Sequence, residues 1–127
     1  MLKEQALVTE ASELSKLLDD SVLRYCELAV PSIEGGHIGS AFLFCTLHGI
    51  DWYWPHFNLG LFVGCTFTGC AFRGAIFSGC RFVDCRFEDC TFGPDNLQGE
   101  CEFNETVWYG CTQKNCIGLG SLVPAEA

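Results

Sequence analysis

The chain has 127 residues, of which 49% are hydrophobic, with a mean hydropathy of +0.22 and a formal net charge of -9. This length and apolar content predict one folded domain with a real core and exclude a disordered chain. The excess of acids disfavours direct nucleic-acid binding, which requires basic surfaces.

The first twenty residues read MLKEQALVTEASELSKLLDD. Leu7, Ala11, Leu14 and Leu18 recur every three to four residues, which predicts one amphipathic helix over residues 1–20. Charges run throughout this segment, so it is unlike a signal peptide, and no later stretch is apolar enough to span a membrane. We therefore predict a cytoplasmic protein without membrane contact, whose ten cysteines remain thiols.

A strict period of five follows in the middle of the chain. Phenylalanine occupies Phe57, Phe62, Phe67, Phe72, Phe77, Phe82, Phe87 and Phe92. Neither a helix nor a flat strand has this period. The residue two places before each centre is usually small, most often cysteine, and the residue two places after is often glycine or aspartate, which favour turns.

This pattern of a small residue, a polar residue, a central Phe or Leu and two variable residues resembles the pentapeptide-repeat family. The resemblance implies an all-β solenoid, a right-handed quadrilateral β-helix with four pentads per coil. The phase extends back to Leu23, with one residue missing before Phe42, and forward through Leu97 and, after one extra residue near Glu100, to Gly118. It predicts twenty pentads over residues 21–120, or about five coils, and a tail over 121–127. The helix over 1–20 is then expected to cap the open edge of the first coil.

All ten cysteines lie two places before a predicted centre, so we expect each to fill an inner corner as a small hydrophobic side chain. The predicted columns are Cys26, Cys45, Cys65, Cys85 and Thr106; Cys70, Cys90 and Cys111; and Cys80 and Cys101. Coils about 4.8 Å apart exceed the roughly 3.8 Å between the Cβ atoms of a disulfide. The sequence has no CxxC or HxxxH pair, so we expect no metal and no cofactor.

Nothing in the sequence predicts an enzyme. His37, His48 and His56 are expected to point outward on different faces, and none has a serine, cysteine or carboxylate beside it in a triad. A regular solenoid lacks a deep cleft, and no motif for phosphate or nucleophile chemistry is present.

An apolar stripe is the first candidate for partner binding. Leu43, Val63 and Val83 each stand one place after a centre and are expected to stack, with Leu61 and Phe44 beside them. Such a stripe indicates either a partner protein or a segment of the same chain lying on it.

Tyr53 and Trp54 are the second candidate, because both are expected to point outward. They are either an interface anchor or side chains packed against a neighbouring segment.

Acids gather toward the C-terminal half, and the predicted acidic patch consists of Asp84, Glu88, Asp89, Glu102 and Glu105. Relatives of the quinolone-resistance type mimic B-form DNA and engage gyrase, so the resemblance implies this role as an alternative. Five coils span about 24 Å, over which duplex DNA carries about fourteen charges. Residues 21–120 hold ten acids and five bases, so their net charge is 5 − 10 = -5. This is far less negative than the charge of DNA of the same length.

Taken together, these features predict a non-enzymatic protein-interaction module that modulates or neutralises a protein partner, of the regulatory or toxin-immunity type. The alternative is a DNA-mimicking protector or inhibitor of DNA gyrase or topoisomerase IV. Because no helix is predicted after residue 120, the last coil is expected to be covered either by the short tail or by a second copy. The resemblance to gyrase-binding members of the family implies that such a second copy would form a homodimer through that end.

Overall fold

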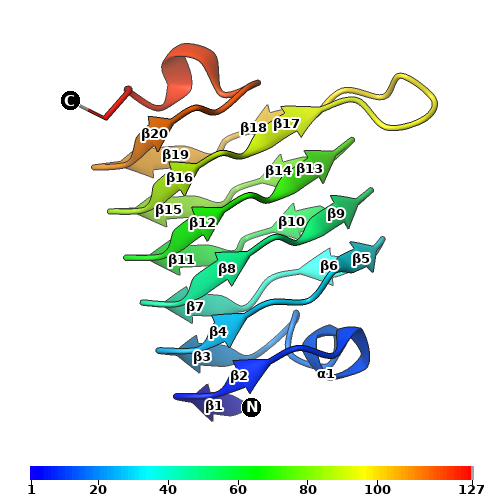
Figure 1. Cartoon of the computed structure of the whole chain (residues 1–127), viewed down its shortest axis with the longest axis vertical. Coiled ribbons are helices and arrows are strands. Elements are labelled where there is room, and N and C mark those ends of the chain that lie inside the picture. Colours follow the sequence, from blue (N-terminus) through cyan, green and yellow to red (C-terminus); the bar gives the residue numbers. More distant parts are fainter. Residues whose placement is uncertain (127) are drawn as a thin grey trace.

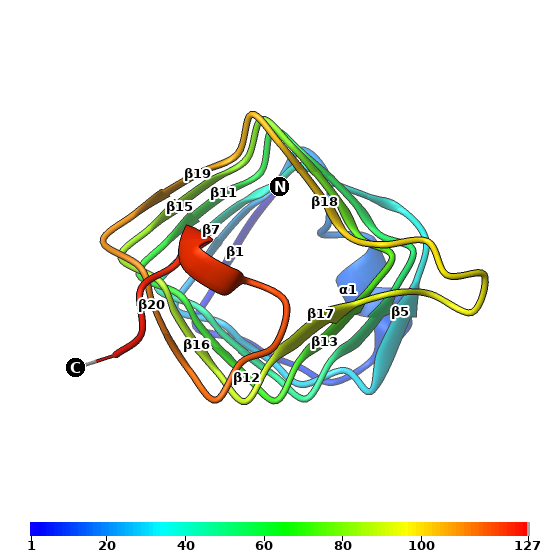
Figure 2. The same ribbon diagram turned by 90° about the horizontal axis from the view of Figure 1, so that it is seen from above.

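The structure is a computed structural model of the chain, and it describes residues 1–126. Twenty short parallel strands wind into one solenoid, so the predicted all-β solenoid of about five coils is confirmed (Figure 1). The strands form four sheets, which are the four sides of the coil (Figure 2). We name them faces A, B, C and D in the order in which the chain visits them.

Faces A and B have six strands each, and faces C and D have four each. Face A consists of β1 (Leu2–Glu4), β3 (Val22–Arg24), β7 (Ala41–Leu43), β11 (Leu61–Val63), β15 (Arg81–Val83) and β19 (Val107–Tyr109). Face B consists of β2 (Leu7–Val8), β4 (Glu27–Leu28), β8 (Thr46–His48), β12 (Thr66–Thr68), β16 (Arg86–Glu88) and β20 (Thr112–Lys114). Face C consists of β5 (Ser32–Glu34), β9 (Asp51–Tyr53), β13 (Ala71–Arg73) and β17 (Thr91–Gly93). Face D consists of β6 (His37–Ile38), β10 (His56–Asn58), β14 (Ile76–Ser78) and β18 (Glu102–Asn104).

Stacked aromatic rings fill the interior. In a three-residue strand the middle side chain points into the coil and its two neighbours point outward, because side chains alternate across a strand. The ring centroids of Phe42 and Phe62 are 4.6 Å apart, and those of Phe62 and Phe82 are 4.8 Å apart. This is the spacing of hydrogen-bonded strands, so ring stacking and backbone pairing favour the same register.

The thiols occupy the inner corners, as predicted. All ten are free, and eight of them are buried. The Sγ atom of Cys65 lies 3.2 Å from the carbonyl oxygen of Phe42, and that of Cys85 lies 3.3 Å from that of Phe62. Each of these thiols therefore donates a weak hydrogen bond to the preceding coil while it fills the corner.

The outer corners require a left-handed backbone. Gly64 has a φ of 62° and Asp84 a φ of 54° at these positions. Glycine adopts this conformation without strain, and aspartate tolerates it. The period of five thus consists of three strand residues and a two-residue turn, whose first residue needs a positive φ.

The predicted helix over residues 1–20 is wrong in extent. Strands β1 and β2 extend faces A and B downward, and the helix α1 covers only Ala11–Ser15. Residues Leu2–Glu4 pair with β3 because an open strand edge offers hydrogen bonds that a helix cannot use. Lys3 takes the central position below Leu23, where its Nζ atom lies 3.2 Å from Oε2 of Glu13.

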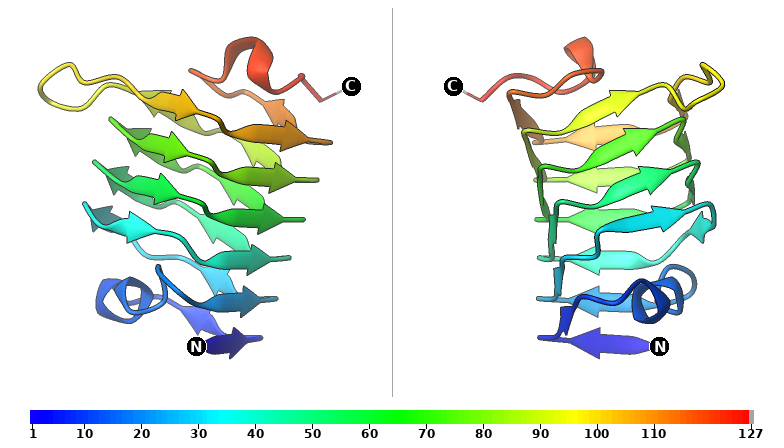
Figure 3. Two further views of the ribbon diagram at one scale, coloured as in Figure 1. Left: turned by 180° about the vertical axis from the view of Figure 1, so that it is seen from behind. Right: turned by 45° about the vertical axis from the view of Figure 1, so that its right-hand side comes forward.

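The N-terminal segment does cap the solenoid, as predicted, but only at faces C and D. The helix α1 contacts β5 at the lower end of the solenoid (Figure 3). Leu14, Leu17 and Leu18 are buried in the core. The carbonyl oxygen of Leu18 accepts a hydrogen bond of 2.8 Å from the backbone N–H of Gly39. The segment therefore closes faces C and D from below, while faces A and B end in β1 and β2.

The second correction concerns Leu97, which is not a pentad centre. Residues 94–100 leave the coil as a protruding loop, and Leu97 is 82% exposed. Phe103 stacks above Phe77, 26 residues earlier in the chain. Leu97 fits the repeat in the sequence because it is apolar and five residues after Phe92. The segment nevertheless leaves the coil, and Pro94 at its start lacks the N–H group that a paired strand would need.

The predicted thiol columns above this loop are consequently wrong. Thr106 lies above Cys80 rather than Cys85, since its Oγ1 accepts a hydrogen bond from the Cys80 N–H. Cys111 lies above Cys85, where the N–H of Thr112 donates to the Cys85 carbonyl. The loop moves every later residue to a different face from the one predicted.

The tail folds over part of the last coil. The 3-10 helix η1 (Gly120–Leu122) lies above the coil opening in Figure 2, and Leu119 and Val123 are buried. Gln113 takes a central position, and its Nε2 donates to the carbonyl oxygens of Gly120 at 2.9 Å and Val123 at 2.6 Å. Of the two predicted coverings, the tail is therefore present, and the homodimer stays a prediction.

Candidate protein-interaction face

The outer surface of face A is apolar over most of its height. Val63 pairs in register with Leu43 below and Val83 above, as predicted from the sequence. Leu61 lies on the same strand as Val63, with Ala41 beneath it. All five side chains are half-buried, which leaves a continuous apolar strip in contact with solvent.

Two aromatic side chains border this strip at the corner between faces A and B. The rings of Tyr25 and Phe44 are stacked with centroids 5.4 Å apart, and they are 56% and 51% exposed. Both residues have a φ of 55°, in the left-handed region. We call this pair the aromatic ridge.

The aromatic ridge is costly to maintain. A non-glycine residue in the left-handed region costs roughly 1–2 kcal/mol, and the next corner of the same column is occupied by Gly64. The Phe44 ring lies over Gly64 so closely that a Cβ atom there would meet its Cδ1 at 2.5 Å. The left-handed backbone is a property of the outer corners, since Gln5, Asp84 and Glu105 also adopt it. What distinguishes Tyr25 and Phe44 is that their large rings are exposed at these corners.

Neither the N-terminal segment nor the tail covers this strip. The helix α1 lies against β5 of face C, and the tail pairs with β20 of face B through Gln113 and Ala125. Figure 2 shows both segments away from the outside of face A. Of the two readings of the stripe, a covering segment within residues 1–126 is therefore wrong.

Charged groups interrupt face A only near its ends. Arg24 pairs with Glu4 at the lower end, and both side chains are partly exposed. Arg81 is exposed beside Val83 at the upper end, and Asp84 occupies the adjoining corner. The middle of the strip, at Leu43, Leu61 and Val63, is free of charge.

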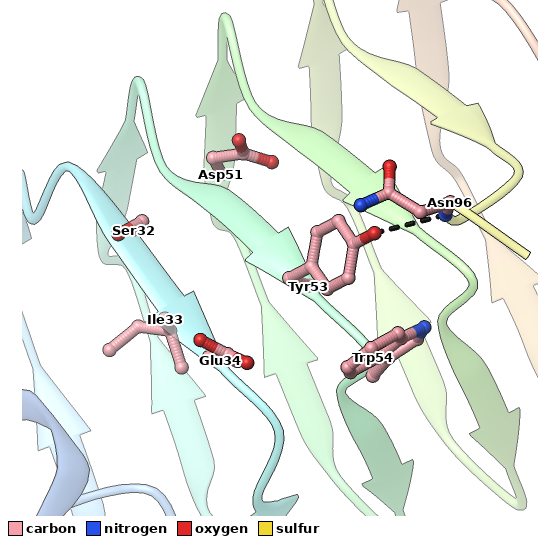
Figure 4. A pocket seen from close by; sticks show the side chains of 7 residues that line it. All are labelled: Ser32, Ile33, Glu34, Asp51, Tyr53, Trp54 and Asn96. Carbon is pink, nitrogen blue, oxygen red and sulfur yellow. Dashed lines mark hydrogen bonds between the residues drawn. The ribbon is translucent and has the colours of Figure 1, made fainter.

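Tyr53 and Trp54 belong to a different surface. They lie on face C and its corner, on the side of the coil opposite face A, so the predicted set does not form one site. The Tyr53 Oη accepts a hydrogen bond of 2.9 Å from the N–H of Asn96 (Figure 4), and the Trp54 Nε1 donates to Oδ2 of Asp95 at 2.6 Å. They therefore pack against the loop 94–100, with a hollow of about 380 Å³ beside them.

The predicted acidic residues also separate. Asp84, Glu88 and Asp89 lie along β16 and its two corners, on face B. Glu102 is on face D, and Glu105 is at the corner between faces D and A. Glu88 stands beside Lys114 in register, which offsets part of its charge. The five acids therefore form no single patch.

The histidine prediction is wrong in one respect. His37 and His56 share face D, with ring centroids 5.0 Å apart, whereas His48 lies on face B. Within residues 1–126 no group of three or more His, Cys, Asp and Glu side chains could hold a metal ion. The same residues include no helix that is long and apolar enough to cross a membrane.

Several residues of the candidate face were missed by the sequence analysis. The pattern of pentads did not predict a role for Tyr25, nor for Leu59 and Tyr109, which are 72% and 61% exposed. Tyr109 continues the column above Val83. A bulky apolar residue at a position that favours glycine was the signal that could have identified Tyr25 and Leu59.

Comparison with known proteins agrees with the repeat pattern. Residues 55–93 match a family model described as pentapeptide repeats (9 copies). Two solved structures of trypsin-treated variants of QnrB1, a plasmid-mediated fluoroquinolone resistance protein, are similar to this chain at 9% and 8% identity, with TM-scores of 0.33 and 0.27. Each likeness covers 91% of this chain, and 75% and 72% of the respective QnrB1 chain. No curated protein sequence matches the chain.

Proposed function

Because this chain is built of pentapeptide repeats, we propose that it is a non-enzymatic protein-interaction module that binds a partner through face A and thereby modulates or neutralises it. The aromatic ridge is the observation that carries this proposal. Tyr25 and Phe44 keep large rings in solvent beside an uncovered apolar strip. Such rings are favoured at the energetic centres of protein interfaces.

The size of face A indicates what kind of surface it can bind. Six strands about 4.8 Å apart and three residues wide present roughly 24 Å by 10 Å. Any partner that contacts this footprint alone would bury roughly 500 Å² in total, below the about 1,000 Å² of a stable interface, so the proposed complex is a transient one. An amphipathic helix of about 16 residues has the same length and width. We therefore propose a partner that lays a helix along face A, between Leu59 and the aromatic ridge.

Mimicry of DNA is the second function that the sequence suggested, and the charge arrangement gives it less support. The five acids lie on separate sides of the coil, and Arg86 pairs with Glu126 at 2.5 Å among them. Binding by mimicry would weaken steeply with salt, whereas binding through Leu43, Val63 and Phe44 would persist.

The test compares a face A variant with a matched variant on face B. Val63→Asp places a charge at the centre of the strip, and Thr68→Asp places the same charge on the outside of the next strand. In affinity capture from a native lysate at low and high salt, the wild type and Thr68→Asp should retain a common partner at both salt concentrations. Val63→Asp should reduce its recovery at least tenfold.

The variants also separate the alternatives. Retention of the same partner by Val63→Asp would contradict the proposed face. Gyrase or topoisomerase IV subunits that leave all three baits at high salt would instead support mimicry.

A second variant tests the cost of the aromatic ridge. Phe44→Gly relieves about 1–2 kcal/mol of backbone strain but removes a ring pair worth about 0.5–1.5 kcal/mol. The free energy of unfolding should therefore change by no more than about 1.5 kcal/mol while partner binding falls, as shown by denaturant titration and capture of the same sample. A large loss of stability would mean that the ridge serves the fold.

A further inference from the structure

His37 and His56 lie side by side on the outside of face D. Strands β6 and β10 pair with His56 opposite His37, and the ring centroids are 5.0 Å apart with the planes tilted by 46°. The side chain of His37 is exposed, and that of His56 is half-buried. Solvent therefore reaches a pair of imidazoles held by adjacent strands.

The repeat itself creates this juxtaposition. Each histidine stands one residue before a centre of face D, His37 before Ile38 and His56 before Phe57, and these two centres pair. The coil that joins the histidines takes 19 residues, because the centres Ile38 and Phe42 are four residues apart instead of five, and the pairing is kept across this shorter step.

We propose that His37 and His56 form a chelating surface site for a divalent transition-metal ion, with water in the remaining coordination positions. Imidazole nitrogen is a preferred ligand of Ni²⁺, Cu²⁺ and Zn²⁺. Bonds of about 2.0–2.1 Å put two ligand nitrogens of a tetrahedral ion roughly 3.3 Å apart. Rings whose centroids are 5.0 Å apart reach this spacing by rotation of their side-chain torsions.

The surroundings support the site without completing it. The Nε2 atom of His56 is 3.4 Å from the Oγ of Ser78 on the next strand, so this hydroxyl is available to the ring nitrogen that does not bind the ion. The net charge of -9 raises the local concentration of cations around the molecule. Within residues 1–126 no third His, Cys, Asp or Glu joins the pair, so we expect metal binding to leave the fold unchanged.

The probe is Ni²⁺ alone, added to the full chain at neutral pH, because Ni²⁺ does not oxidise the free thiols. We expect its paramagnetism to broaden the imidazole NMR signals of His37 and His56 before those of His48. Isothermal titration should give one ion per chain. Since the second imidazole binds intramolecularly, His56→Gln should weaken the affinity about 100-fold. His48→Gln, on face B, should leave it unchanged.

Two results would overturn the site. One is equal broadening of all three histidines. The other is an affinity that His56→Gln does not change, which would assign the ion to thiols such as Cys101. The melting temperature of His56→Gln should equal that of the wild type. If it is lower, the nickel affinity is measured on His37→Gln instead, because the exposed side chain of His37 can be removed without affecting the core.

Discussion

At the scale of single residues, the thiols illustrate how position in the coil controls reactivity. Eight are buried, and only Cys101 and Cys116, next to the loop and the tail, are partly exposed. Burial raises the pKa of the Cys101 thiol and of the Cys116 thiol above the ordinary value of 9.0. The reactive thiolate is therefore scarce at neutral pH even where a reagent can reach it.

We expect a chromogenic disulfide reagent to titrate only Cys101 and Cys116 in the native protein. Their reaction rates should rise with pH up to and beyond 9, because the raised pKa of each thiol delays formation of the thiolate. The other eight should react only after unfolding. Replacing both residues by serine should abolish the native-state reaction, and fast reaction of a third thiol would contradict the burial of the corners.

At the scale of elements, a single carboxylate organises the loop 94–100. The Asp95 Oδ1 accepts hydrogen bonds of 2.8 Å from the N–H groups of Leu97 and Gly99, while Oδ2 accepts one from Trp54. The N–H of Gly99, followed by those of Leu97 and Trp54, lowers the pKa of Asp95 below its ordinary 3.8. Because the folded-state pKa is lowered, this stabilisation is complete above pH 3.8 and is lost as the pH falls through the folded-state value.

Trp54→Phe should loosen this loop without affecting the coil. It removes the Nε1 donor to Asp95, so we expect amide hydrogen exchange at Leu97 and Gly99 to accelerate severalfold while the melting temperature stays the same. Tyr53→Phe is the matched control, since it removes only the acceptor of the Asn96 N–H. In the wild type, the indole N–H resonance of Trp54 should shift as the pH falls below 3.8. If amide exchange is unchanged in Trp54→Phe, the hydrogen bonds within the loop are sufficient to stabilise it without Trp54.

At the scale of the whole molecule, the count of residues between centres decides the face of every later side chain. Deleting Pro94–Gly99 removes six residues and leaves Phe92 and Phe103 five apart, in phase. Deleting Pro94–Gln98 removes five and shifts all later residues by one, which turns Phe103 and Trp108 outward. We expect the first variant to melt cooperatively with every corner thiol protected.

The second variant should lose the last coil and expose Cys111 to the thiol reagent. Circular dichroism and thiol counting on both proteins measure the difference. Equal stability of the two deletions would mean that the last coil contributes little to the fold.

By itself the sequence determined the coil, its aromatic core and the corner thiols. Each depends on a local pattern of five residues that repeats along the chain. The stripe Leu43, Val63 and Val83 was predictable for the same reason, because no insertion interrupts the chain between these residues.

Only the tertiary structure decided where the five-residue period between centres is interrupted. Leu97 is apolar at the right interval, yet it leaves the coil, and Leu2–Glu4 joins the sheet through backbone hydrogen bonds that do not depend on side-chain type. The neighbours of each face are set by strand pairing across a whole coil, and the energy of that pairing is not contained in any one pentad.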